Sequence, residues 1–348
     1  MGPTGDTINV IQIHPTKRCN LRCKHCYSTS GPRYSSELSI ESLLSILEDA
    51  WRERYNGVGV SGGEPLLYPP LPMLLESARR CGFLTTVTTN GLLIDPRRLD
   101  QLTPHLSLLA ISVDGSPESH DRMRSMPGAF EKMRRKLEHV RAAKVPFGFI
   151  FTLTLENLHE LDFVARMAAA EGASLLQVHP LEGVGRAREY SLDPPDELEL
   201  AYGFLEVARL QTLYRNRLVL QYDVADRVLI ESEPCRAFAI PPPDSVPGED
   251  VALSRLVSPL VVQDDGWVVP VQYGFSRAYA IGHISCGSLQ DQAARWKSER
   301  YLDFLALSRR VWTALRPAPA HLPFTNWYAA ITTASADTPG PAPIPAPT

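Results

Sequence analysis

Three cysteines lie close together near the start of the chain and carry the strongest chemical signal in the sequence. Cys19, Cys23 and Cys26 are separated by three and then two residues, in the segment CNLRCKHC. Thiolates on one short loop can converge on a compact metal centre, and thiolate-rich sets select zinc or iron–sulfur clusters. A cubane cluster ordinarily takes four protein ligands, so this local set would leave one iron open to an exogenous ligand.

A structural zinc site is the alternative reading of the same residues. His25 lies directly before the last cysteine and could complete a tetrahedral set with the three thiolates. On that reading the protein is a zinc-stabilised binding module and not an enzyme. The spacing alone leaves both possibilities open.

The cysteine loop must be positioned by the elements around it. The apolar segment INVIQI predicts a strand over residues 8–13, and the following His-Pro-Thr ends it. Strand and helix patterns then alternate along the chain six times. Predicted strands cover residues 8–13, 57–61, 83–88, 106–113, 147–155 and 173–179, and predicted helices cover 40–54, 71–80, 129–143 and 158–170.

The predicted strands are almost continuously apolar, as is typical of strands buried in a parallel sheet. Six units are too few to close an eight-stranded barrel, so the sequence predicts an α/β fold with an open (β/α)6 partial TIM barrel. Chemistry in such barrels lies on the loops at the C-terminal ends of the strands. Polar and glycine-rich motifs follow each predicted strand, so we expect them to meet at one rim. These include the cysteine loop, residues 62–65, Asn90, Asp114, Asn157 and residues 182–186.

The cysteine spacing, the aromatic His25 and the Gly-Gly-Glu-Pro turn together resemble the signature of radical S-adenosylmethionine (radical SAM) enzymes. The resemblance implies that Cys19, Cys23 and Cys26 hold a [4Fe–4S] cluster whose fourth iron is chelated by the amino and carboxylate groups of SAM. One electron from the cluster would cleave SAM to a 5′-deoxyadenosyl radical, which abstracts a hydrogen atom from the substrate.

The same resemblance implies contacts with SAM at several positions. The Gly-Gly-Glu-Pro turn would receive the amino group of SAM. Asp114 would contact SAM or is an ordinary turn residue, and Asn157 would contact SAM or is the N-cap of the next helix. Gln177 and His179 lie two apart on one strand and therefore face the same side, which could be the barrel interior. The candidate cofactor-binding residues are Gly62, Gly63, Glu64, Pro65, Asn90, Ser112, Asp114, Asn157, Gln177 and Arg186.

The pattern changes after residue 225. Two apolar runs joined through Asp265-Gly266 predict a hairpin over residues 260–270. This segment resembles the C-terminal extension of the SPASM/twitch branch, in which cysteines bind auxiliary clusters. Cys235 matches the first such position, but the cysteine expected after Pro270 is absent, and two thiols are too few for a cluster. We expect a barrel over 8–225, a degenerate α+β extension over 226–315 and a Pro/Ala-rich, disordered tail over 316–348.

An extension without a cluster favours redox-neutral chemistry, such as epimerisation. An epimerase needs a hydrogen donor, and Cys235 is the first candidate, with Cys286 and Cys81 as others; each could equally be a small buried apolar residue. We expect a tailoring enzyme for a ribosomal peptide or natural product. The alternative is a small-molecule enzyme, namely a sugar or nucleoside epimerase, dehydratase or decarboxylase.

The composition gives no indication of binding to nucleic acid or membranes. The chain has 348 residues, a net charge of −4 and a pI near 6.2, which give no general attraction to nucleic acid or anionic lipid. It shows neither a signal peptide nor an apolar run long enough to span a membrane, so we expect a cytoplasmic protein. We expect a flavodoxin- or ferredoxin-type electron donor. Because the first predicted strand begins near the N-terminus, leader recognition would need a separate leader-binding protein.

Overall fold

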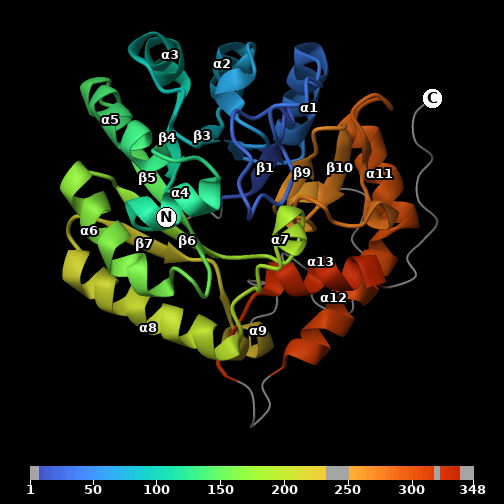
Figure 1. Ribbon diagram of the computed structural model, residues 1–348. Coiled ribbons are helices and arrows are strands. Elements are labelled where there is room, and N and C mark those ends of the chain that lie inside the picture. The colour runs from blue at the N-terminus through green and yellow to red at the C-terminus, as the bar shows by residue number, and fades with distance from the viewer. Residues whose placement is uncertain (1–7, 233–250, 317–321, 338–348) are drawn as a thin grey trace.

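The computed structural model describes residues 8–232, 251–316 and 322–337. An open sheet of ten strands forms its centre, in the order β11-β10-β9-β1-β2-β3-β4-β5-β6-β7 (Figure 1). The strands from β1 to β7 pair in parallel and do not close into a barrel. The prediction of an open, parallel α/β sheet is confirmed. These strands are β1 Val10–Ile13, β2 Gly57–Val60, β3 Leu84–Thr89, β4 Leu108–Ser112, β5 Phe147–Leu153, β6 Leu175–Pro180 and β7 Val219–Tyr222.

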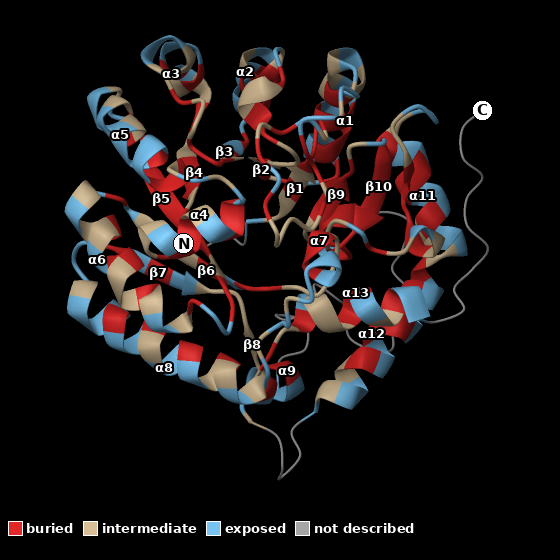
Figure 2. Ribbon diagram, in the orientation of Figure 1, coloured by how far each residue is buried: buried red, intermediate tan, exposed pale blue. Residues whose placement is uncertain are grey.

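Helices cover the outer side of this sheet and bury its apolar side chains (Figure 2). Ser39 caps the first helix by accepting a hydrogen bond from the Ser42 amide, and Leu43 and Leu47 are fully buried, as their helical spacing predicts. The helices are α1 Ile40–Arg52, α2 Leu71–Cys81, α3 Pro96–Leu102, α4 Pro117–Arg124, α5 Ala129–Ala142, α6 Leu161–Glu171, α7 Arg186–Glu189 and α8 Glu197–Tyr214.

The inner side of the sheet is accessible. On β6, Leu176 and Val178 are buried, whereas the alternate residues Gln177 and His179 are half-buried and exposed. Ser112 at the end of β4 is likewise partly exposed. Because successive side chains of a strand point to opposite faces, the exposed set faces the interior of the open barrel. That interior can therefore receive ligands.

Three strands of the C-terminal extension continue the barrel sheet, while two short strands form a separate antiparallel pair. Strand β9 (Leu260–Val262) pairs in parallel with β1, and β10 (Trp267–Pro270) pairs with β9 as the predicted hairpin. The hydroxyl of Tyr55 donates to the Val257 carbonyl across this junction at 2.7 Å. The remaining elements are β8 Ala225–Asp226, α9 Arg227–Ser232, β11 Gly282–His283, α11 Leu289–Glu299, α12 Tyr301–Leu315, β12 Phe324–Thr325 and α13 Trp327–Asp337.

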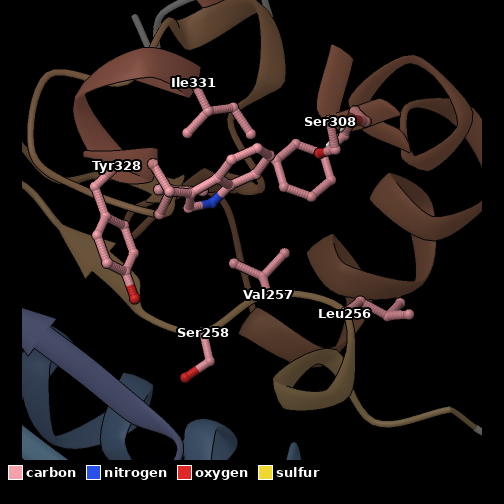
Figure 3. A pocket seen from close by; sticks show the side chains of 9 residues that line it. Leu256, Val257, Ser258, Ser308, Tyr328 and Ile331 are labelled. Atoms are coloured by element: carbon pink, nitrogen blue, oxygen red, sulfur yellow. Dashed lines mark hydrogen bonds between the residues drawn. The ribbon is translucent and has the colours of Figure 1, made fainter. Parts of the chain in front are cut away.

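The prediction of a disordered tail is wrong for residues 322–337. Helix α13 lies within that range, with Trp327 and Ile331 buried one helical turn apart. They pack with Tyr328 against Leu256 and Ser308 around a cavity of about 10 Å³, which has room for no more than a water molecule (Figure 3). The apolar stripe was hidden by the Ala/Thr-rich composition. Residues 317–321 and 338–348 lie outside the described residues.

In the described parts of the chain, no helix is both long enough and apolar enough to cross a membrane.

Candidate functional site

The cysteine loop follows β1 and gathers the three thiols. Cys19 and Cys23 are buried, Cys26 is half-buried, and all three are free. They form one small cluster with Leu21 and Met126. Burial, together with the charges of a nearby carboxylate and the other two thiols, raises the pKa of Cys19 to about 12. Three clustered and largely buried thiols fit a metal centre whose positive charge displaces their protons.

Hydrogen-bond donors point at two of these sulfur atoms. The Arg124 guanidinium lies 3.7 Å from Cys23 Sγ through Nη1, and the Asn90 amide lies 4.0 Å from Cys19 Sγ. The Leu21 backbone N–H also donates to Cys19 Sγ, at 3.4 Å. Such donors stabilise negative charge on sulfur, and hydrogen bonds of this kind influence the reduction potential of iron–sulfur clusters.

The residues of the alternative zinc site are not assembled. His25 would be the fourth ligand, but its Nε2 lies 3.2 Å from the carboxylate of Asp114. Among the described residues, no three His, Cys, Asp or Glu side chains converge on the position of a single metal ion. The thiol cluster therefore fits a polynuclear centre better than a zinc ion.

The two glycines of the Gly-Gly-Glu-Pro turn bring it against the cysteine loop. Gly63 donates through its backbone N–H to the Thr16 carbonyl at 2.9 Å, and a Cβ on Gly63 would lie 2.1 Å from the Arg18 carbonyl oxygen. Gly62 has a φ of +107°, which favours glycine. The resemblance assigns this turn to the amino group of SAM; in the structure its two glycines allow close approach of the cysteine loop.

Glu64 ties this turn to the end of β3. Its buried carboxylate accepts hydrogen bonds from the Leu66 amide, the Thr89 hydroxyl and the Asn90 amide, at 3.1, 2.7 and 2.9 Å. Burial raises the pKa of Glu64 despite these donors. Pro65 follows and begins a short 3-10 turn. The structure thus brings the predicted residues of the turn and Asn90 together beside the cysteines.

Asp114, at the end of β4, lies at the centre of a buried charge network. Its Oδ2 accepts from Arg124 Nε at 2.5 Å and lies 3.2 Å from His25 Nε2. Burial opposes ionisation, but the Arg124 and His25 charges outweigh it and hold the pKa of Asp114 well below its usual range. The second oxygen, Oδ1, is buried and has no hydrogen-bond partner among the described residues. It is an open acceptor at the barrel rim.

The sequence analysis missed Arg124. It lies in α4, whose other basic residue, Arg122, is exposed, so the two look alike in sequence. In the structure the helix ends directly after Arg124, at Ser125 in a left-handed conformation. No local pattern indicates that one of the two side chains reaches both a cysteine and Asp114.

Two predicted SAM contacts have other partners in the structure. Asn157 does not cap the following helix with its side chain; its amide donates to the Asp114 and Thr152 carbonyls and its oxygen accepts from the Thr154 amide. Arg186 Nε donates to the Cys23 carbonyl at 2.7 Å, and Nη1 donates to the Ser30 carbonyl at 2.8 Å. Both residues therefore brace the rim, and Arg186 holds the backbone of the cysteine loop.

A second polar group lies on the inner face at the ends of β6 and β7. His179 Nδ1 is 2.6 Å from the carboxylate of Asp223, which also accepts from the amide of Gln177 at 2.9 Å. Desolvation would lower the pKa of His179, but the Asp223 charge more than reverses this and raises it. Ser112, on the same inner face, is half-buried.

The candidate hydrogen donors are not at the cysteine loop. Cys235 lies outside the described residues. Cys286 is exposed near Ser285 in the extension. Cys81 ends α2, directly before β3 begins, and so lies at the opposite edge of the sheet from the cysteine loop.

Residues 13–168 match the sequence profile of the Radical SAM superfamily. The match covers just under half of the chain, which is similar to this superfamily over that segment. Its members are enzymes that bind a [4Fe–4S] cluster and SAM, and the three free thiols of the loop fit that cluster. The matched segment extends from β1 to α6 and contains the cysteine loop, the glycine turn and Asp114.

Curated relatives match about half of the chain. Fe-coproporphyrin III synthase of Methanosarcina barkeri is 31% identical over 179 residues, which are 51% of this chain and 45% of that protein. Mycofactocin maturase MftC of Mycobacterium tuberculosis is 32% identical over 186 residues, which are 51% and 46% of the two chains. The chain thus spans about half the length of these relatives.

Solved structures of the SPASM/twitch branch share the fold. Streptococcus suis SuiB bound to S-adenosylmethionine gives a TM-score of 0.66 at 13% identity, over 86% of this chain and 67% of that one. SuiB has also been solved with its precursor peptide SuiA. A structure of anSMEcpe with bound AdoMet and a peptide gives a TM-score of 0.62 at 18% identity, over 93% and 95% of the chains.

Proposed function

We propose that the protein cleaves SAM reductively at a [4Fe–4S] cluster held by Cys19, Cys23 and Cys26. The observation that supports this best is the buried loop of three free thiols, which Arg124 and Arg186 contact from separate elements. When bound, the cluster supplies the electron that generates a 5′-deoxyadenosyl radical from SAM, and this radical abstracts a hydrogen atom from the substrate.

The surrounding residues divide into those that shape the loop and those that remain free for the cofactor. The cysteine loop is shaped by the backbone of Gly62 and Gly63, which packs against it, and by the guanidinium of Arg186, which donates hydrogen bonds to it. Asp114 keeps its unpartnered Oδ1, which would accept a hydrogen bond from a hydroxyl group of SAM. Ser112 and Gln177 line the accessible inner face, where the remainder of the cofactor would lie. Arg124 keeps Asp114 ionised for this role.

The substrate is a ribosomal peptide or a related natural product. Support comes from SuiB and anSMEcpe, whose structures contain peptides and whose folds resemble this one. A tetrapyrrole substrate is the second candidate, because Fe-coproporphyrin III synthase is among the relatives. Epimerisation, dehydration or decarboxylation of a sugar or nucleoside is the remaining alternative, and Cys235 is the proposed hydrogen donor if the reaction is an epimerisation.

The reaction needs partners that supply electrons and substrate. A flavodoxin- or ferredoxin-type protein would reduce the cluster, and a separate protein would present a peptide leader. We place the protein in the cytoplasm, because thiols stay reduced there and free cysteines persist.

The experiment is SAM cleavage under dithionite after anaerobic reconstitution, with 5′-deoxyadenosine measured by chromatography. The wild-type chain is expected to form 5′-deoxyadenosine, and Cys23→Ala is expected to abolish it. Cys81→Ala is the matched control, since Cys81 lies at the opposite edge of the sheet, and it is expected to retain cleavage. Cleavage that survives Cys23→Ala would contradict the proposal.

A further inference from the structure

A cleft of about 550 Å³ lies between the loop that follows β6 and helix α13. Figure 1 shows α13 beside α7, across the open side of the barrel. Helix α13 presents two faces: Trp327 and Ile331 anchor one face in the extension, whereas Ala330, Thr333 and Asp337 on the other face line the cleft. The wall of the cleft is therefore a packed helix.

The cleft lies next to the cysteine loop. Val184 lines it, and Gly185 follows so closely against the loop that a Cβ on Gly185 would lie 2.5 Å from the Cys26 carbonyl oxygen. The next residue, Arg186, donates its backbone N–H to the same Cys26 carbonyl at 3.0 Å. A molecule bound in the cleft would thus lie close to the place where the cofactor is cleaved.

Glu182 is one of two carboxylates in the lining of this cleft. Its carboxylate accepts one hydrogen bond, from the neutral amide of Gln272 at 3.1 Å. Among the described residues, no lysine or arginine lies within ion-pair distance of Glu182. Burial raises the pKa of Glu182, because a desolvated carboxylate is unfavourable as an anion, and the charge of His179 and the Gln272 hydrogen bond offset this only in part.

The other charged groups near the cleft do not neutralise Glu182. His179 is paired with Asp223 at 2.6 Å, so only part of its charge acts on Glu182. Arg188 is exposed at the rim and donates through Nε to the Gly183 carbonyl at 2.5 Å. Asp337, at the end of α13, adds a second carboxylate to the lining.

We propose that this cleft binds the substrate through a cationic group, an ammonium or guanidinium, that pairs with Glu182. A charge-assisted hydrogen bond from such a group would offset the cost of the desolvated carboxylate. The proposal deepens the proposed function, on which it rests, by favouring a peptide with a basic side chain or free amino terminus. It disfavours a tetrapyrrole, whose propionate groups would be repelled by Glu182 and Asp337.

Binding of small probes to the reconstituted, unreduced protein tests the proposal. The probes are N-acetyl-lysine N-methylamide, the uncharged N-acetyl-norleucine N-methylamide and coproporphyrin III, with dissociation constants taken from saturation-transfer NMR titrations. The lysine probe is expected to bind about tenfold more tightly than the norleucine probe, as a hydrogen bond to a charged group implies. Glu182→Gln is expected to remove this preference. Glu189→Gln, which changes an exposed carboxylate of α7, is the matched control and is expected to keep it.

Equal binding of the lysine and norleucine probes would overturn the proposal, as would a preference that survives Glu182→Gln in a folded variant, shown by circular dichroism. Displacement of the lysine probe by coproporphyrin III, or failure of both amide probes to bind, would also overturn it. Because no reductant is present, these results do not depend on SAM cleavage. An absence of 5′-deoxyadenosine would instead contradict the proposed function and leave the binding result intact.

Discussion

Replacing Arg124 with methionine is expected to destabilise the protein strongly. The side chains of Asp114 and Arg124 are 0% and 8% exposed, and their charged atoms are 2.5 Å apart. Methionine preserves much of the volume but leaves the Asp114 carboxylate buried with only His25 as a partner. Removing one partner of a buried ion pair costs about 3–5 kcal/mol, so we expect the free energy of unfolding to fall by about that amount.

The assay is urea unfolding of the cluster-free chain, monitored by circular dichroism. Arg98→Met is the matched control, because Arg98 pairs with Asp95 at the surface, where both side chains are at least one-third exposed. That loss is expected to stay below about 1 kcal/mol. The double replacement of Arg124 by Met and Asp114 by Leu is expected to recover much of the stability, since no uncompensated charge remains.

A cost below about 1 kcal/mol for Arg124→Met would refute this reasoning, as would a double variant less stable than the single one. The pH dependence supplies a further check. The folded-state pKa of Asp114 is depressed, so its contribution is fully present above the unfolded-state pKa of about 4 and is lost only as pH falls below it. The contribution of the Asp114 carboxylate to the stability of the wild-type chain is therefore expected to stay constant from about pH 8 to 5.

Three further predictions follow from the packing. Gly63→Ala is expected to lower both stability and iron loading, because its Cβ would meet a backbone oxygen at 2.1 Å. Gly31→Ala is the control and is expected to be mild, because its Cβ would lie 3.9 Å from the Leu21 carbonyl oxygen; equal iron content in the two variants would contradict this. His14 and His120 have pKa values lowered by burial to about 3 and about 4, so the unfolded chain binds more protons below about pH 6.5. The free energy of unfolding is expected to fall between pH 7 and 5, by up to about 1.4 kcal/mol per pH unit for each group, and less steeply in His14→Phe; identical slopes in urea titrations would argue against it. Trp327→Ala is expected to cost about 3–5 kcal/mol in the same assay, and a loss below 1 kcal/mol would mean that α13 is not anchored.

The strands and helices of the barrel could be predicted well, because the patterns that specify them involve residues close together in the sequence. The predicted strands and helices between residues 8 and 179 begin and end within a few residues of their positions in the structure, since apolar periodicity and caps such as Ser39 act over short distances, whereas α3 and α4 were not predicted. The pairing of β9 with β1 was not predictable in this way. It joins segments far apart in the chain, as the contact between the Val10 amide and the Ser258 hydroxyl shows, and no local pattern specifies such a partner.

The residues of the site that directly follow the ends of strands could be predicted from the sequence. The cysteines, Glu64, Asn90 and Asp114 do meet at one rim. Their partners were not predictable, because Arg124 reaches the site from a polar helix and Arg186 uses its guanidinium on backbone carbonyls. Residue type alone does not show whether an arginine faces a cofactor or braces a loop.

The iron and acid-labile sulfide content of the anaerobically reconstituted chain tests the central claim most directly. Three cysteine ligands predict one cubane, so we expect about four irons and four sulfides per chain, and neither in a variant with Cys19, Cys23 and Cys26 replaced by alanine. Zinc without iron, or iron that the triple variant retains, would contradict the assignment of the cluster to this loop. About eight irons would confirm the cluster but contradict the expectation that the extension holds none.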